Sequence, residues 1–91
     1  MNIVKNVALI ERLKSGLLSD TAALFETLLD KNSTASARKE VLAAILTDVY
    51  LLAEKLNIGS SELDSAAVTR LRSMDSPDLQ AEIQVLLGKI K

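Results

Sequence analysis

Hydrophobic and polar residues alternate with a helical period along most of the chain, and most regularly between Glu40 and Ile58. Apolar residues recur there at steps of three and four, the spacing of one face of an α-helix: Leu42, Ile45, Leu46, Val49, Leu52, Ala53 and Leu56. A milder stripe runs beside this face: Val41, Ala44, Asp48, Leu51 and Lys55. A helix that is apolar around more than half of its circumference contacts neighbours on two sides. We therefore expect this helix to be the centre of the fold.

The same spacing predicts helices over most of the remaining chain. With the central helix, the predicted helices span about residues 2–16, 19–30, 36–57, 61–73 and 77–90. Gly16 favours an end to the first helix because glycine costs about 1 kcal/mol inside a helix, and Ser19 is a candidate N-cap for the second. A single unbroken helix is the alternative. The polar segment 31–36 predicts a loop, with Ser33, Thr34 or Ser36 capping the central helix.

Local signals also mark the later boundaries. Gly59 is a candidate for the left-handed position after the central helix. Residues 61–64 (Ser-Glu-Leu-Asp) fit a capping box in its acidic form, which would open the fourth helix. Ser76, Pro77 and Asp78 combine an N-cap, a proline at the first helical position and an early acid, so they predict the start of the last helix.

Composition supports an all-α fold of four to five helices. The chain has 91 residues, enough for a single domain with a modest core. It is 48% hydrophobic with only two aromatic residues, Phe25 and Tyr50, so its core consists of aliphatic side chains that suit helix packing. Such apolar excess in a small helical chain often ends in a subunit interface. We therefore expect a homo-oligomer, a dimer or a tetramer.

Charge and residue types exclude several classes of function. The net charge of −1 comes from 11 basic and 12 acidic residues spread along the chain, which argues against nucleic-acid binding. The chain has no cysteine and no histidine, so thiolate chemistry and the commonest general base are excluded. Neither a membrane-spanning run nor a signal-peptide pattern is present. We expect a cytoplasmic protein without membrane attachment.

Carboxylates are the remaining candidates for chemistry. Glu26 and Asp30 lie four residues apart on one helix face and could share a divalent cation such as Mg²⁺, although such pairs are more often a solvated helix end. Asp48 lies in the middle of the apolar central helix, where a carboxylate needs a partner. It is either a ligand in a cleft or, the reading we favour, a residue at the rim or in a salt bridge with Lys55 or a neighbouring subunit.

Two segments resemble the MazG-like branch of the all-α NTP pyrophosphohydrolase superfamily. Residues 17–28 (Leu-Leu-Ser-Asp-Thr-Ala-Ala-Leu-Phe-Glu-Thr-Leu) are similar to the second helix of that family. Residues 41–58 resemble its third helix, in which Glu-x-x-Asp precedes an apolar run and a Leu-Gly-Ile ending. The resemblance covers residues 3 to 73 and implies a helical protomer whose long helices pair in an oligomeric bundle.

The resemblance also implies a chemistry that this chain departs from. The family uses Glu-x-x-Glu on its second helix and Glu-x-x-Asp on its third to bind Mg²⁺ and to cleave NTP to NMP and pyrophosphate. In our alignment the first pair falls on Ser19 or Asp20 and on Ala23, and the second pair on Val41 and Ala44. Glu26 matches an outer glutamate, and Asp48 lies one turn beyond the lost aspartate.

Three hypotheses about function follow. The first is a catalytically degenerate MazG-like protein that acts as an interaction or regulatory module, with no cofactor and with a nucleotide or protein as possible ligand. The second is a Mg²⁺-dependent NTP pyrophosphohydrolase whose site is rebuilt from displaced acids: Asp20, Glu26, Asp30 and Asp48. Of these, Asp20 and Asp48 are the catalytic candidates, and Glu26 and Asp30 the metal candidates. The third is an unrelated helical oligomerisation protein.

Overall fold

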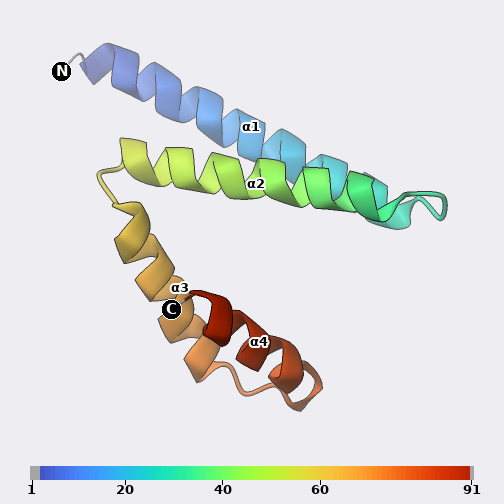
Figure 1. Ribbon diagram of the computed structural model, residues 1–91. Coiled ribbons are helices and arrows are strands. Elements are labelled where there is room, and N and C mark those ends of the chain that lie inside the picture. Colours follow the sequence, from blue (N-terminus) through green and yellow to red (C-terminus); the bar gives the residue numbers. More distant parts are fainter. Residues whose placement is uncertain (1–2, 91) are drawn as a thin grey trace. The chain divides into compact units, whose positions relative to one another are not determined.

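The structure is a computed structural model that describes residues 3–90, with the side chains of residues 5–89. The described residues form four α-helices and a short 3₁₀ helix, and no strand (Figure 1): α1 (Ile3–Leu29), α2 (Ala35–Lys55), α3 (Ser60–Ser73), η1 (Pro77–Leu79) and α4 (Gln80–Ile90). The predicted all-α fold is confirmed. Asn2, where the first predicted helix begins, lies outside the described residues. The chain divides into two compact units, Met1–Asn57 and Ile58–Lys91, and a single domain over the whole chain stays a prediction.

Helix α1 runs without a break through Gly16 and Ser19, so the predicted separation into two helices is wrong. Gly16 faces α2: a Cβ added there would lie 3.9 Å from Oδ1 of Asp48. Because α1 packs on α2 on both sides of this glycine, burial of its apolar face offsets the cost of about 1 kcal/mol that glycine carries in a helix. Ser19 is an exposed residue inside the helix and caps nothing.

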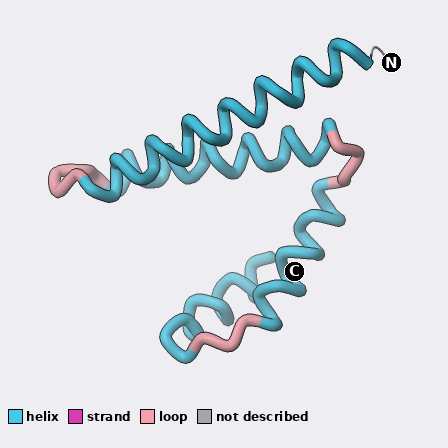
Figure 2. Tube along the Cα trace, turned by 180° about the vertical axis from the view of Figure 1, so that it is seen from behind, coloured by secondary structure: helices cyan, strands magenta, loops and turns pink. Residues whose placement is uncertain are grey.

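Helices α1 and α2 lie side by side as an antiparallel hairpin (Figures 1 and 2). Partly buried residues recur along both helices at alternating steps of three and four, the pattern of a two-helix seam. On α1 they are Leu9, Leu13, Gly16, Asp20, Ala23 and Thr27, and on α2 they are Val41, Ile45, Asp48 and Leu52. The seam is apolar at both ends, while its middle contains two aspartates.

Hydrogen bonds fix the loop between the two helices where the sequence predicts it. The hydroxyl of Thr34 accepts a hydrogen bond from the backbone N–H of Ala37 at 3.0 Å, so Thr34 is the N-cap of α2. The carboxylate of Asp30 accepts one from the N–H of Asn32 at 2.9 Å. Arg38 donates to the carbonyl and the hydroxyl of Ser33, both at 3.0 Å. The loop therefore holds the end of α1 against the start of α2.

The boundary after α2 differs from the prediction. The left-handed residue is Asn57, with a φ of 64°, and not Gly59. Asparagine tolerates this conformation because its short polar side chain bonds locally. Gly59 is instead the N-cap of α3, and its backbone N–H donates to the carboxylate of Glu62 at 3.4 Å. The capping box thus begins two residues earlier than predicted. It has only the hydrogen bond to the glutamate side chain, because Gly59 has no side chain to accept the other one.

The second unit consists of α3, η1 and α4, and its helices pack around Ile83, which is only 4% exposed. Ser76 and Pro77 begin a helical segment as predicted, but its first turn is the 3₁₀ helix η1, which continues directly into α4. Among the described residues no helix is long and apolar enough to cross a membrane.

Candidate functional site

The middle of the α1–α2 seam brings together two carboxyl groups from different helices. Asp20 on α1 and Asp48 on α2 are both half-buried, and their carboxyls lie close enough for Asp20 to raise the pKa of Asp48. Gly16 lies one turn before Asp20 and leaves space for Asp48, whose Oδ1 would be 3.9 Å from a Cβ at that position. We call these three residues the acid layer.

The pKa of Asp48 lies above the ordinary value of an aspartate. The hydrogen bond with Asp20 raises the pKa of Asp48 above its ordinary value, and desolvation and the charge of Asp20 raise it further. Oxygen Oδ2 of Asp48 is closed to solvent and has no hydrogen-bond donor. Two ionised carboxylates can only accept hydrogen bonds, so a hydrogen bond between these two groups forms only when one of them is protonated.

The seam becomes apolar one turn nearer the hairpin loop. Ala23 on α1 and Ala44 on α2 are half-buried there, and Val41 follows within another turn. We call these three residues the apolar layer. They are the positions where the sequence alignment expects metal-binding acids, and of the four aligned positions only that of Asp20 can carry an acid.

Glu26 and Asp30 do not join that pair. Both are exposed and lie at the end of α1. The backbone N–H of Asp30 donates to the carbonyl of Glu26 at 3.1 Å, and the Asp30 carboxylate caps the turn at Asn32. The two residues therefore form a solvated helix end, the alternative that the sequence also allowed. Their role as a metal-binding pair stays a prediction.

Asp48 does not pair with Lys55 in the structure, and a position at the rim or a salt bridge with a neighbouring subunit stays a prediction. The seam turns it towards α1 and Asp20, while Lys55 lies two turns further along α2, beside a groove. Its buried oxygen lacks any donor, so the predicted ion pair with Lys55 is not formed. The reason is the register of the hairpin, which places an acid opposite an acid.

The acid layer fits a hydrated divalent cation poorly. Mg²⁺ keeps several of its waters and takes only oxygen ligands in a near-octahedral arrangement. Here Oδ2 of Asp48 is closed to solvent, and the neighbouring seam positions carry hydrogen and methyl groups. Among the residues that the structure describes, no group of three or more His, Cys, Asp or Glu side chains is placed to hold a metal ion.

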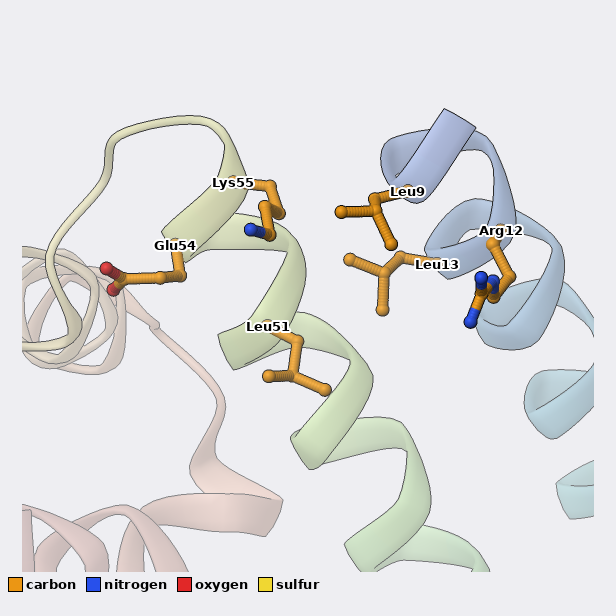
Figure 3. Close-up of a pocket in the computed structure, with 6 residues that line it drawn as sticks. All are labelled: Leu9, Arg12, Leu13, Leu51, Glu54 and Lys55. Carbon is orange, nitrogen blue, oxygen red and sulfur yellow. The ribbon is translucent and has the colours of Figure 1, made fainter. Parts of the chain in front are cut away.

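A groove opens on the other side of the acid layer, between the first half of α1 and the last turns of α2. Its volume is about 350 Å³, and its walls combine three leucines with charged side chains (Figure 3): Leu9, Arg12, Leu13, Leu51, Glu54 and Lys55. Leu9 and Leu13 point towards α2, whereas Glu54 points away from α1. A second, wide-open hollow lies against α4, at Ala81, Glu82, Val85 and Leu86.

Sequence reasoning missed both the contact between Asp20 and Asp48 and the groove. A signal for the contact was present, because Asp48 is a lone acid within an apolar stripe and Asp20 lies at a seam position of α1. The groove had no such signal, because it depends on how far the two helices diverge beyond the acid layer.

Comparison with known proteins agrees with the resemblance seen in the sequence. The model of the MazG-like family matches residues 3–84, which is most of the chain. No curated protein and no solved structure matches it. The hypothesis of an accidental likeness is therefore wrong, and a relation to the NTP pyrophosphohydrolases follows. With its helical hairpin and this match over residues 3–84, the chain belongs to the MazG-like family.

Proposed function

We propose that the chain is a catalytically degenerate MazG-like protein that works as an interaction module and hydrolyses no nucleotide. The observation that carries this proposal is the apolar layer. Ala23, Val41 and Ala44 supply methyl groups to the seam at the positions where the family chemistry needs carboxylates. An enzyme of this type requires acids on two facing helices to converge on Mg²⁺, which activates water and neutralises the triphosphate.

The alternative is a pyrophosphohydrolase with a rearranged site, and the contact between Asp20 and Asp48 is the observation in its favour. Two carboxylates on facing helices are a minimal Mg²⁺ site when substrate phosphates supply further oxygens. Against this alternative, the Asp48 oxygen that would bind the ion is closed to solvent, and Glu26 and Asp30 lie exposed at the helix end.

Release of pyrophosphate separates the two functions. Purified protein at high concentration is incubated with a panel of NTPs and dNTPs in the presence of Mg²⁺ or Mn²⁺. The degenerate module releases no pyrophosphate above the level of the Asp48→Asn variant. Metal-dependent release that disappears in Asp48→Asn and persists in Glu26→Gln would establish the rearranged enzyme and overturn the proposal.

The partner of the module follows from the two unlike sides of the α1–α2 hairpin. Steps of seven residues place the polar set on one side: Arg12, Ser19 and Glu26 on α1, and Glu40, Thr47 and Glu54 on α2. The same steps place an apolar set on the other side: Ile10, Leu17 and Leu24 on α1, and Leu42, Val49 and Leu56 on α2. Leu28 and Leu46 extend the apolar side, and Leu28, Leu42 and Leu46 are 61%, 54% and 54% exposed.

We propose that a second copy of the chain covers this apolar side. Helix α1 of 27 residues is about 40 Å long, α2 of 21 residues is about 30 Å long, and each is about 10 Å wide, so the side of the hairpin presents about 700 Å². That is close to the area of about 800 Å² that each partner buries in a standard stable interface. An apolar surface on two antiparallel helices is complementary to itself under a two-fold axis, which would complete a four-helix bundle.

Mass in solution tests this partner. Light scattering after size exclusion is expected to give a dimer or a higher oligomer for the natural chain. Leu42→Glu together with Leu46→Glu is expected to yield a folded monomer, whereas Thr47→Glu on the polar side leaves the mass unchanged. A monomeric natural chain, or a double variant that keeps its oligomeric mass, would show that a second copy does not occupy this side.

A further inference from the structure

The groove between the first half of α1 and the last turns of α2 contains a leucine on the polar side of the hairpin. Leu51 follows Thr47 by four residues and precedes Glu54 by three, so it shares their side of α2, and it is 50% exposed. Leu9 and Leu13 point towards α2 from the opposite wall (Figure 3). An exposed apolar strip with charged side chains around it is typical of a binding site.

The charges around these leucines favour an anionic ligand. Arg12 belongs to α1 and Lys55 to α2, and in the view of Figure 3 the two leucines of α1 lie between their side chains. Glu54, the acid of the lining, points away from α1. Neither cation forms an ion pair with any residue whose side chain the structure describes. Both positive charges are therefore available to a ligand in the groove.

The groove is too short for a docked helix and has the size of a small-molecule site. Its lining covers one turn of each helix, residues 9–13 on α1 and 51–55 on α2, which is about 6 Å along the helix axis. A helix that lies in a groove uses anchors from i to i+7, which extend over about 10 Å. The groove volume of about 350 Å³ lies in the range of roughly 300–1,000 Å³ that small-molecule sites occupy.

The residue types of the lining favour a ligand with an aliphatic body. Leucine side chains make dispersion contacts with methylene groups and form no hydrogen bonds. A flat polar ring needs aromatic side chains to stack on, or amides and hydroxyls to fix its orientation. None of the six described lining residues is aromatic or carries an amide or a hydroxyl group. An aliphatic chain with one anionic end therefore matches the groove better than a ring does.

We propose that the groove binds a medium-chain aliphatic carboxylate. The methylene groups of the ligand lie against Leu9, Leu13 and Leu51, and its carboxylate lies at Arg12 and Lys55. Removal of the methylene groups from water stabilises the complex, and guanidinium and ammonium groups form charge-assisted hydrogen bonds with carboxylate oxygens. The groove opens on the polar side of the hairpin, so a second copy on the apolar side leaves it accessible.

Titration of the full chain with octanoate, followed by the amide chemical shifts of the ¹⁵N-labelled protein, tests the proposal. Saturable shift changes are expected at residues 9–13 and 51–55, and none around Leu42 and Leu46 on the apolar side. From butyrate through hexanoate to octanoate, the affinity is expected to rise about two- to fourfold for each added methylene. Octylammonium has the same chain and the opposite charge, and it is expected to bind about tenfold more weakly. Shift changes centred on the apolar side, or equal affinity for the two octyl ligands, would overturn the proposal.

Reversal of the two charges supplies the decisive comparison. Arg12 and Lys55 are exposed, so Arg12→Glu with Lys55→Glu is expected to fold and to bind octylammonium more tightly than octanoate. Lys55→Gln alone is expected to weaken octanoate binding about two- to fivefold, and it replaces the double variant if that variant folds poorly. Leu51→Ala is expected to weaken binding about fivefold through lost apolar contact. Lys39→Gln removes an exposed charge from the other end of α2 and is expected to keep the natural affinity.

Two results would contradict the proposed ligand. One is a natural chain that binds none of the three carboxylates, and the other is a set of groove variants that all bind octanoate as the natural chain does. Neither result involves pyrophosphate release or the mass in solution, so such a failure leaves the proposed function standing.

Discussion

The acid layer and the apolar layer are neighbours in one seam, yet the first carries carboxyl groups and the second carries only apolar side chains. In the first, Asp20 and Asp48 meet beside a glycine, and Asp20 raises the pKa of Asp48. In the second, one turn away, Ala23, Val41 and Ala44 pack the same two helices with methyl groups. The same two helices, α1 and α2, pair in both layers. What differs is whether the side chains can hold charge.

This difference teaches that helix pairing and metal catalysis place different demands on the same seam positions. Helix pairing needs only small or apolar side chains at seam positions, and alanine or valine satisfies that need better than a carboxylate. Metal catalysis needs several acids at the same positions. A seam with small apolar side chains in one layer can therefore form a hairpin without the acids that metal catalysis needs.

Putting acids into the apolar layer should have the largest effect. The triple variant Ala23→Glu, Val41→Glu and Ala44→Asp places three new anions beside the existing pair, and we expect it to lose about 3 kcal/mol of unfolding free energy in urea. Millimolar Mg²⁺ should restore part of this loss, because an ion bound only by the folded chain stabilises it.

The control for the triple variant is Ala22→Glu, which adds a charge on the exposed face of α1 and should change stability by less than about 0.5 kcal/mol. If the folded triple variant shows no gain in Mg²⁺ affinity, the alignment of Ala23, Val41 and Ala44 with the family's acids is wrong.

Filling the space in the acid layer should have a moderate effect of the opposite sign. Gly16→Ala removes the conformational cost of glycine inside α1, and its new Cβ would meet Asp48 at an ordinary contact distance of 3.9 Å. We expect a gain of about 0.5–1 kcal/mol in the urea unfolding free energy. Gly88→Ala, whose Cβ would contact nothing within 4 Å, is the matched control on α4. A loss of stability in Gly16→Ala alone would mean that the carboxyl pair needs this space.

Breaking a surface ion pair should have the smallest effect on stability. Its salt dependence provides a reference for the effect of the charges in the seam. Glu11→Gln removes the 2.9 Å ion pair between Glu11 and Lys14. The side chains of Glu11 and Lys14 are 63% and 56% exposed. We expect a change of about 0–0.5 kcal/mol that vanishes at high salt. The same salt should not abolish the difference between the natural chain and Asp48→Asn at neutral pH. If salt abolished the effect of Asp48→Asn as it abolishes that of Glu11→Gln, the pair Asp20 and Asp48 would lie in open solvent.

The sequence predicted those parts of the fold that depend on neighbouring residues. The periodicity of residues 40–58, the loop at 31–36 and the cap at Thr34 are local signals, and the structure has all three. The continuity of α1 through Gly16 was not predictable in this way, because packing against a distant helix offsets a local cost. Asn57 likewise took the left-handed position expected of Gly59.

The candidate site was predicted only in part. Asp20 and Asp48 were both singled out, but separately, and the sequence assigned Asp48 to a rim or a salt bridge. Their meeting depends on the register between α1 and α2, which is set by the length and capping of the loop and by the packing along the seam. A helical period tells which face a residue occupies, and not which residue of another helix lies opposite.

Binding of Mn²⁺ at neutral pH, followed by the loss of its free electron paramagnetic resonance signal, tests the central claim most directly. If the seam holds no metal site, the natural chain should leave the free Mn²⁺ signal at the level seen with Asp48→Asn. Stoichiometric loss of the signal with the natural chain, abolished in Asp48→Asn and in Asp20→Asn, would contradict the account and show that the remaining pair is a metal site.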